Sequence, residues 1–264
     1  MFTSPGEIIV KIGNVSIYYY GLIIAIALLS GILISGRIAK KFYPDLNYEI
    51  IYDITPSIII GAILGARLYY CLLSYDYYIT NPIEILELRH GGLSIHGAII
   101  GGLIGGIIYA KKHKLPILKL CDIFSFGLVM GQAIGRWGNF FNSEAFGTPT
   151  ANFLKLYIPV YKRPLEYLQF EYFHPAFLYE SILDILIFLV LLFLIRKIAK
   201  GKDGIIFFSY LILYSIARLI VEQIRIDSVL YIMEIPIAQI ISVIIILISA
   251  IFIFKLKDSG EDST

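Results

Sequence analysis

The sequence has few charged residues, four histidines and only two cysteines. Asp, Glu, Lys and Arg make up 16% of its 264 residues, which is low for a soluble domain. It contains no HExxH, CxxC or Walker-type glycine loop, and no Ser-His-Asp arrangement can be inferred. These absences disfavour metal, nucleotide and covalent-serine chemistry. We therefore expect no metal, no dissociable cofactor and no nucleic-acid partner.

Hydrophobic residues, in contrast, make up 58% of the chain. A bilayer core of about 30 Å needs roughly 20 apolar residues per helix. Lipid offers no partners for backbone polar groups, so each long apolar stretch is predicted to be helical. We expect an all-α integral membrane protein with about seven transmembrane helices, forming one polytopic domain over residues 1–264 with no cleaved signal. The expected spans are 16–35, 50–73, 94–110, 117–134, 176–195, 204–221 and 235–254.

Lysines and arginines are concentrated in alternate loops. Basic groups follow the first, third, fifth and seventh stretches, whereas the other loops are longer and have fewer of them. Cytoplasmic loops of membrane proteins carry this excess. We therefore expect the N-terminus outside the cell and the C-terminus in the cytoplasm, with a cytoplasmic tail over approximately 255–264.

The longest connection, approximately residues 135–175, falls on the outer face in this topology. It is rich in Tyr, Phe and Pro. Aromatic residues with a polar tip favour the headgroup level of a membrane, so this segment is predicted to be a small interfacial head.

Two stretches carry glycines at four-residue spacing, which lets helices approach closely. They are Gly97, Gly101 and Gly105 in the third stretch, and Gly127, Gly131 and Gly135 in the fourth. We expect a packing role for most of these glycines. Cys71 and Cys121 lie inside apolar runs and are expected to be core residues.

Unusual polar residues occur at one end of six predicted helices. Since these helices alternate in direction, the topology places the residues at one depth, near the outer face. Polar groups at that depth are functional candidates by default, and we expect one shared site in the outer leaflet. Its members are Tyr20, Arg67, His96, Arg136, His174, Glu180, Arg218, Glu222 and Arg225.

Within the sixth stretch, Tyr214, Arg218, Glu222 and Arg225 follow a spacing that puts them on one helix face. The structural alternative is that Arg218 and Glu222 simply neutralise each other, because charges inside a membrane usually pair. Against it, Arg67, Arg136 and Arg218 are expected to outnumber the carboxylates near them, which leaves room for an anionic ligand. Guanidinium geometry suits phosphate.

The segment 135–147, GRWGNFFNSEAFG, combines an arginine, amides, a carboxylate and glycines beside an apolar helix. The chain here resembles the bacterial prolipoprotein diacylglyceryl transferases. The resemblance extends in order over nearly the whole sequence: YYGL at Tyr20, GARL at Arg67, HGGLSIHG ending at Gly97, Asp122, HPAFLYE from His174, and YSIARLIVEQIR ending at Arg225. Ala98 departs from the glycine often found there.

The resemblance implies transfer of the sn-1,2-diacylglyceryl group from phosphatidylglycerol to the lipobox cysteine of a prolipoprotein signal peptide, with release of glycerol 1-phosphate. It implies that Arg136 and Arg218 hold the phosphate and that His96 is the base for the thiol. An alternative is that the arginines alone activate the thiol. The other residues expected to bind phosphatidylglycerol are Tyr20, Arg67, Asn139, Glu144, Gly147, Glu222 and Arg225.

Such an enzyme is expected in the bacterial cytoplasmic (inner) membrane. The alternative class is a transporter or a lipid-binding membrane protein for an anionic solute. Transporters commonly show internal repeats and a site near the bilayer midplane. The sequence has no convincing repeat, and its polar cluster is predicted near one face.

Overall fold

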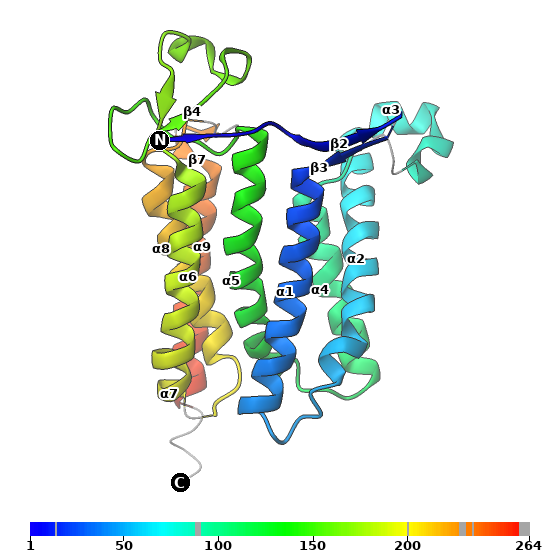
Figure 1. Cartoon of the computed structure of the whole chain (residues 1–264). Helices are drawn as coiled ribbons and strands as arrows, with labels where there is room; N and C mark the ends of the chain where they lie inside the picture. Colours follow the sequence, from blue (N-terminus) through cyan, green and yellow to red (C-terminus); the bar gives the residue numbers. More distant parts are fainter. Residues whose placement is uncertain (14, 88–90, 200, 227–230, 234, 259–264) are drawn as a thin grey trace. The chain divides into compact units, whose positions relative to one another are not determined.

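The computed structural model describes residues 1–264 except 14, 88–90, 200, 227–230, 234 and 259–264, and it is mostly helical (Figure 1). Among the described residues, six helices are long and apolar enough to span a membrane. The predicted class, an all-α integral membrane protein, is confirmed. These six are α1 (Tyr19–Phe42), α2 (Ile50–Leu73), α5 (Ile117–Asn142), α6 with its continuation (Ala176–Ala199), α8 (Ile205–Glu222) and α9 (Ile237–Asp258).

The third predicted span forms α4 (Ile95–Lys112) but is not among those six helices. Its glycines contribute almost no apolar surface, and it ends in Lys111 and Lys112. The third span is thus confirmed as a helix, but with His96, Lys111 and Lys112 among its 18 residues it is not apolar enough over its length to be one of the six. In α6, the α-helix runs over Ala176–Val190, followed by a π-helical turn, Leu191–Ile195, and the short α7, Arg196–Ala199.

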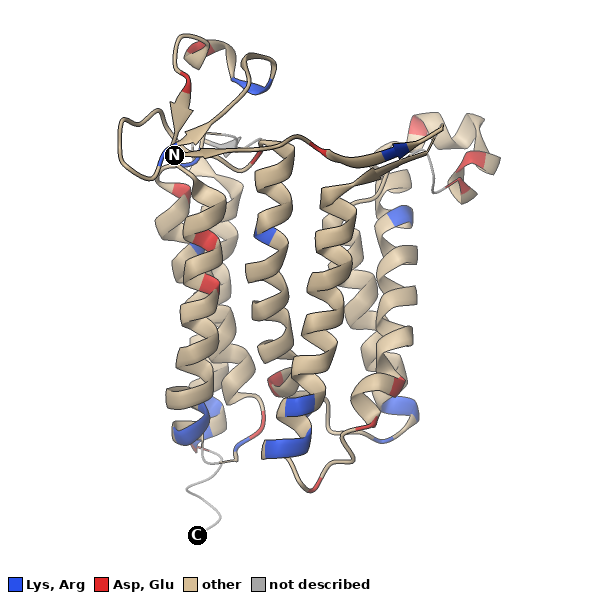
Figure 2. Cartoon of the chain, in the orientation of Figure 1, with Lys and Arg blue, Asp and Glu red and all other residues tan. Residues whose placement is uncertain are grey.

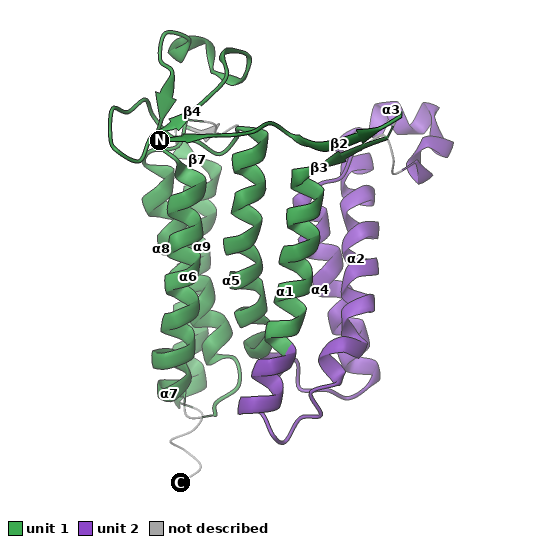
Figure 3. Cartoon of the chain, viewed as in Figure 1, with its two compact units in different colours: residues 1–35, 121–264 green, residues 36–120 purple. Residues whose placement is uncertain are grey.

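The chain forms two compact units, residues 36–120 and residues 1–35 with 121–264 (Figure 3). In the first unit, α2 and α4 pack through glycines. A Cβ on Gly61 would collide with the carbonyl oxygen of Gly101, and one on Gly65 with that of Gly97. The predicted packing role of these glycines is confirmed, and their order shows that the two helices are antiparallel. The helices α3 (Tyr75–Thr80) and η1 (Pro82–Leu86) lie between α2 and α4 in the chain.

The other unit contains α5, α6, α8 and α9. The start of α8 is capped by Asp122 of α5, whose carboxylate accepts hydrogen bonds of 2.7 Å from the backbone N–H groups of both Gly204 and Phe207. These bonds satisfy donors that a helix N-terminus leaves unpaired. Glycines again allow close contact, since a Cβ on Gly127 would collide with the carbonyl oxygen of Gly31 in α1. Asp122 therefore fixes the position of α8 along α5.

The boundary between α5 and the head lies further along the chain than expected. The helix continues through most of the GRWGNFFNSEAFG segment and ends at Asn142. It stops where Ser143 and Ala145 adopt positive φ angles of 51° and 54°, which L-residues seldom adopt. Residues 135–142 are therefore part of the membrane helix, and the head starts at Ser143, not at residue 135.

The head is a folded segment with its own core. Strand β4 (Leu156–Tyr157) pairs in parallel with β1 (Phe2–Thr3) and antiparallel with β5 (Tyr172–Phe173). Two short 3-10 helices, η3 (Val160–Lys162) and η4 (Leu165–Tyr167), lie between β4 and β5. The buried side chains are Phe146, Leu156, Ile158, Phe173 and Phe177. This core joins the head to the first turn of α6, which carries Phe177.

Two hairpins complete the described secondary structure. Strands β2 (Ile8–Ile12) and β3 (Val15–Tyr18) form one of them and leave most of their apolar side chains exposed. Strands β6 (Tyr231–Ile232) and β7 (Ile235–Pro236) form the other, just before α9. Figure 2 shows charged segments toward both ends of the helices, with the acidic segments of α6 toward the end that leads to the head.

Candidate active site

Glu180, in the second turn of α6, is the centre of a cluster of arginines. Its Oε1 lies 2.8 Å from Nη1 of Arg218 and 3.1 Å from Nη1 of Arg225. Its Oε2 lies 2.5 Å from Nε of Arg136, an ion-pair contact without hydrogen-bond geometry. The Glu180 side chain is 6% exposed. One buried carboxylate thus gathers guanidinium groups from α5, from α8 and from just after α8. We call Arg136, Arg218 and Arg225 with Glu180 the arginine cluster.

The helix face predicted for the sixth span contributes further members. Nη2 of Arg218 lies 2.7 Å from Oε2 of Glu222, one turn along α8, and Nη2 of Arg136 donates a hydrogen bond of 3.3 Å to the hydroxyl of Tyr214. The intrahelical pair considered as a structural alternative is therefore present. Arg218 also binds Glu180, so this pair does not neutralise it in isolation.

The amides of the GRWGNFFNSEAFG segment fix the turn that follows α5. Nδ2 of Asn139 donates a hydrogen bond of 2.8 Å to Oε1 of Glu144, and Nδ2 of Asn142 donates one of 3.4 Å to the same oxygen. The backbone N–H of Glu144 also donates to the carbonyl of Asn139. Asn139 and Glu144 thus hold the reversal of the chain directly after the helix turn that carries Arg136.

Gly147 lies where the turn meets the ends of α6 and α8. Its N–H donates to the carbonyl of His174, and it forms a β-bridge with Arg225. A Cβ on Gly147 would stand 2.7 Å from the carbonyl oxygen of Ile224 and 3.0 Å from Cβ of His174. Only glycine allows the backbone at residue 147 to lie this close to Ile224 and His174, and this contact holds the segment against the backbone of Arg225.

Tyr20, in the first turn of α1, packs against the same segment. A Cβ on Gly138 would stand 2.9 Å from Cδ2 of its ring, so the absence of a side chain at Gly138 makes room for the tyrosine. The Tyr20 side chain is 39% exposed, which leaves its ring partly accessible.

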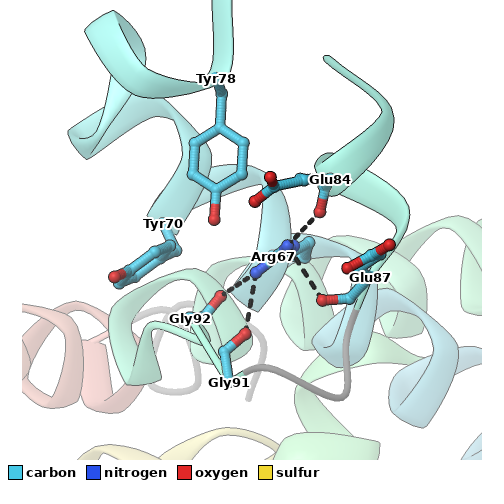
Figure 4. A pocket seen from close by; sticks show the side chains of 7 residues that line it. All are labelled: Arg67, Tyr70, Tyr78, Glu84, Glu87, Gly91 and Gly92. Carbon is cyan, nitrogen blue, oxygen red and sulfur yellow. Dashed lines mark hydrogen bonds between the residues drawn. The ribbon is translucent and has the colours of Figure 1, made fainter. Parts of the chain in front are cut away.

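Arg67, expected in the shared site, belongs to the unit of residues 36–120, and its guanidinium is fully occupied there. Nε donates to the carbonyl of Ile85, Nη1 to Gly91 and Gly92, and Nη2 to Glu84 and Glu87 (Figure 4). A guanidinium has five N–H donors, and all have main-chain acceptors here. This arrangement assigns Arg67 a structural role, holding residues 84–87, 91 and 92 against α2.

The pocket beside Arg67 is lined by Tyr70, Tyr78, Glu84, Glu87, Gly91 and Gly92 (Figure 4). The guanidinium carbon of Arg67 lies 5.2 Å from the centre of the Tyr78 ring. Because the donors of Arg67 are taken, this pocket presents carboxylates and phenol rings, which do not suit an anion. The arginine cluster, in contrast, presents guanidinium groups around Glu180.

His96 lies in the same unit as Arg67, in the first turn of α4. Ser94 caps this helix, with its hydroxyl accepting from the N–H of Gly97. The His96 ring is exposed and its centre lies 6.3 Å from that of Tyr69. His96 is therefore available to solvent or a ligand at a helix start, and its role as a base stays a prediction.

Of the predicted site, one unit brings together Tyr20, Arg136, Asn139, Glu144, Gly147, Arg218, Glu222 and Arg225, whereas Arg67 and His96 belong to the other. The expected excess of arginines over carboxylates is wrong for the described residues of this unit, because Glu180, Glu222 and Asp184 lie among Arg136, Arg218 and Arg225, three carboxylates to three arginines. Asp184 is an acidic residue that was not predicted for the site. The signal that could have revealed it is its place in an apolar run, four residues after Glu180.

The structure thus describes a multi-pass membrane protein with an arginine and carboxylate cluster at one end of its helices, the kind of site that binds an anionic group. Comparison with known proteins narrows this class. A family model for prolipoprotein diacylglyceryl transferase matches residues 7–255. The chain belongs to this family.

Relatives named phosphatidylglycerol--prolipoprotein diacylglyceryl transferase match over most of their length. The protein from Synechococcus elongatus is 46% identical, over 99% of this chain and 92% of its own. That from Nostoc sp. is also 46% identical, over 92% and 86%. That from Acaryochloris marina is 42% identical, over 100% and 96%.

Proposed function

We propose that this chain transfers the sn-1,2-diacylglyceryl group of phosphatidylglycerol to the lipobox cysteine of a prolipoprotein. The cysteine sulfur bonds to the glyceryl carbon, and the bond between that carbon and the phosphate oxygen breaks. Glycerol 1-phosphate leaves, and the thiol proton passes to a base. The observation that carries this proposal is the arginine cluster around Glu180 in a chain of this family.

Arg136 and Arg218 are the groups proposed to hold the phosphate. Each guanidinium has five N–H donors, whereas a carboxylate accepts about four hydrogen bonds, so Glu180 does not exhaust the donors of both. Their side chains are 20% and 19% exposed, which leaves them within reach of a headgroup. Positive groups fixed where charge develops on a leaving phosphate stabilise the transition state.

The other residues of the site hold Arg136 and Arg218 in place. Glu222 and Arg225 complete the ion pairs of the cluster, while Asn139 and Glu144 fix the turn after α5. Gly147 ties that turn to Arg225. Tyr20 and Gly147 contribute to the headgroup pocket in this proposal.

His96 is the proposed base for the thiol. The thiolate is the nucleophilic form of cysteine, and an exposed imidazole is a suitable proton acceptor. We expect His96→Asn to reduce turnover by about 10²-fold or more and to change the pH–rate profile. Full activity with an unchanged profile would remove His96 from the mechanism and leave the arginines as the activating groups.

The protein is proposed to lie in the bacterial cytoplasmic membrane with its N-terminus outside and its C-terminus in the cytoplasm. Basic residues at the ends of α1, α4 and α9 support this orientation. The arginine cluster then faces the outer leaflet, where a signal peptide leaving the translocation machinery meets phosphatidylglycerol.

The activity is tested with purified protein, phosphatidylglycerol in detergent micelles and a synthetic lipobox peptide. We expect the peptide mass to increase by one diacylglyceryl group and glycerol phosphate to appear in equal amount. A peptide with serine in place of the cysteine is the matched control and should stay unmodified. Binding of lipid with no covalent product, for several peptides, would favour the transporter or lipid-binding alternative.

A further inference from the structure

Beneath the arginine cluster lies a second polar layer built from the same three helices. One helical turn deeper, farther from the head, each helix contributes another polar residue. The upper layer is Arg136 of α5, Glu180 of α6 and Tyr214 of α8, and the lower layer is Gln132, Asp184 and Tyr210. Since α6 runs opposite to α5 and α8, a step of four residues in either direction leads to the same depth.

Two members of the lower layer satisfy each other. The hydroxyl of Tyr210 donates a hydrogen bond of 3.0 Å to Oε1 of Gln132. Asp184, the third member, interacts electrostatically with Arg136 and Glu180 above it and with Tyr210 beside it. It is the acidic group of the lower layer, and Arg136 is the positive charge that acts on it.

Asp184 is buried without full hydrogen bonding. It is 2% exposed, and among the described residues no donor reaches its Oδ2. Asp122, 1% exposed, is buried to the same degree, but its two oxygens accept backbone hydrogen bonds. A buried carboxylate oxygen without a donor destabilises a fold. Such a group in a membrane helix points to a use other than stability.

We propose that Asp184 is a positioning residue for Arg136 in the transfer reaction. Its carboxylate draws the guanidinium toward the bundle, while solvent and an anionic headgroup draw it outward. Arg136 contacts Glu180 and Tyr214, and the carboxylate of Asp184 lies one helical turn below Glu180 on α6. Together these groups fix the depth at which Arg136 meets a phosphate. This inference rests on the proposed function of the arginine cluster.

The proposal predicts an unusual combination of effects for Asp184→Asn. Loss of the carboxylate lets Arg136 shift, so kcat should fall on the order of tenfold, because small displacements of positioning groups slow catalysis strongly. The cluster gains net positive charge, so KM for phosphatidylglycerol should not rise. The variant replaces a buried carboxylate, one oxygen of which meets no donor among the described residues, by a neutral amide, so the melting temperature should stay the same or rise. A purely structural residue would show a lower melting temperature with unchanged kcat.

The experiment measures kcat, KM for phosphatidylglycerol and melting temperature in detergent for the wild type, Asp184→Asn and Asp184→Glu. The glutamate variant keeps the charge and should recover most of the lost kcat. Asp122→Asn is the matched control. It neutralises an equally buried carboxylate whose oxygens are satisfied, so it should lower the melting temperature.

Several results would overturn the proposal. Wild-type kcat in Asp184→Asn would show that Arg136 needs no such support. A glutamate variant as slow as the asparagine variant would show that the charge is irrelevant. Failure of Asp184→Asn to fold would also contradict it, because equal or greater stability is predicted. Absence of transfer by the wild type would instead refute the proposed function.

Discussion

Arg67 and Arg218 are both largely shielded from solvent, yet their guanidinium groups have different partners. Arg67 donates to five main-chain carbonyl groups and is 6% exposed. Arg218 lies between Glu180 and Glu222 and keeps 19% of its side chain exposed. The positive charge of Arg67 thus organises a loop, whereas that of Arg218 is balanced by carboxylates that a phosphate can supplement.

The comparison shows that depth and charge alone do not identify a ligand site. Both arginines were predicted at the depth of the shared site, and both belong to stretches that resemble family motifs. The difference is in the acceptors. Carbonyl groups of a loop are fixed by the backbone, whereas carboxylates on neighbouring helices form a charged network whose balance changes when an anion binds.

Removing the central carboxylate with Glu180→Gln should have the largest effect on the arginine cluster. The three arginines then lose their shared partner and repel one another. Removing one partner of a buried ion pair destabilises a protein by about 3–5 kcal/mol, so we expect a lower melting temperature. We also expect transfer to fall below about 1% of the wild-type rate, because the positioned charges are lost. Thermal denaturation and peptide modification measure the two effects, and near-wild-type values for both would contradict the role of Glu180.

Lysine substitutions at Arg218 and Arg67 test directly whether the two arginines have different roles. In Arg218→Lys the charge stays but the planar fork is lost, so we expect transfer to fall about tenfold or more, with a small change in stability. Arg67→Lys leaves buried carbonyl groups without donors, so we expect a lower melting temperature. Its kcat per folded molecule should change little. Each variant is the control for the other. Slower transfer in Arg67→Lys together with lower stability in Arg218→Lys would show that Arg67 binds the phosphate and that Arg218 is structural.

Gly147→Ala tests the backbone that joins the head to the cluster. A methyl group there would stand 2.7 Å from the carbonyl oxygen of Ile224, so the chain at Arg225 must shift. We expect kcat to fall several-fold, with less effect than loss of a charged group. Gly131→Ala is the matched control, because a Cβ there would stand 3.4 Å from its nearest neighbour. Equal activity of the two alanine variants would show that the approach at Gly147 is not needed.

An exposed ion pair gives the smallest expected effect. Nζ of Lys119 donates a hydrogen bond of 2.5 Å to Oδ2 of Asp45, whose side chain is 63% exposed. This bond lowers the pKa of the Asp45 carboxyl below its ordinary value of 3.8. A lowered folded-state pKa stabilises the protein above the unfolded-state pKa and ceases to do so as the pH falls through the folded-state value.

The Asp45 effect should be barely measurable, since solvent screens exposed pairs. Melting temperature is compared between the wild type and Asp45→Asn from pH 7 down to pH 3. A small difference that decreases toward pH 3 is expected, because the pKa of Asp45 in the folded state lies below 3.8. A large difference, or one that grows as the pH falls, would contradict this assignment.

Much of the fold follows from the apolar pattern. The second span was predicted at 50–73 and is Ile50–Leu73, because its apolar run and its ends coincide. The fourth was predicted to end at 134 but continues to Asn142. Polar side chains such as Arg136 and Asn139 end the apolar run, yet they are compatible with helical backbone, and their polar groups bind Tyr214 and Glu144.

The candidate site was predictable only where its contacts are local. Spacing alone predicted that Arg218 and Glu222 share a helix face, and they form an ion pair. The central role of Glu180 depends on contacts between helices, which spacing does not reveal. The five hydrogen bonds of Arg67 go to main-chain carbonyl groups. Every residue has such a group, so the sequence does not reveal which ones Arg67 will bind.

The central claim, that the arginine cluster holds the phosphate of the lipid, is tested most directly by competitive inhibition with glycerol 1-phosphate, the proposed product. Its inhibition constant is measured for the wild type, Arg218→Lys and Arg67→Lys. We predict that inhibition weakens about tenfold, or roughly 1.4 kcal/mol, in Arg218→Lys and stays unchanged in Arg67→Lys. Unchanged inhibition in Arg218→Lys, or weakening confined to Arg67→Lys, would contradict the claim.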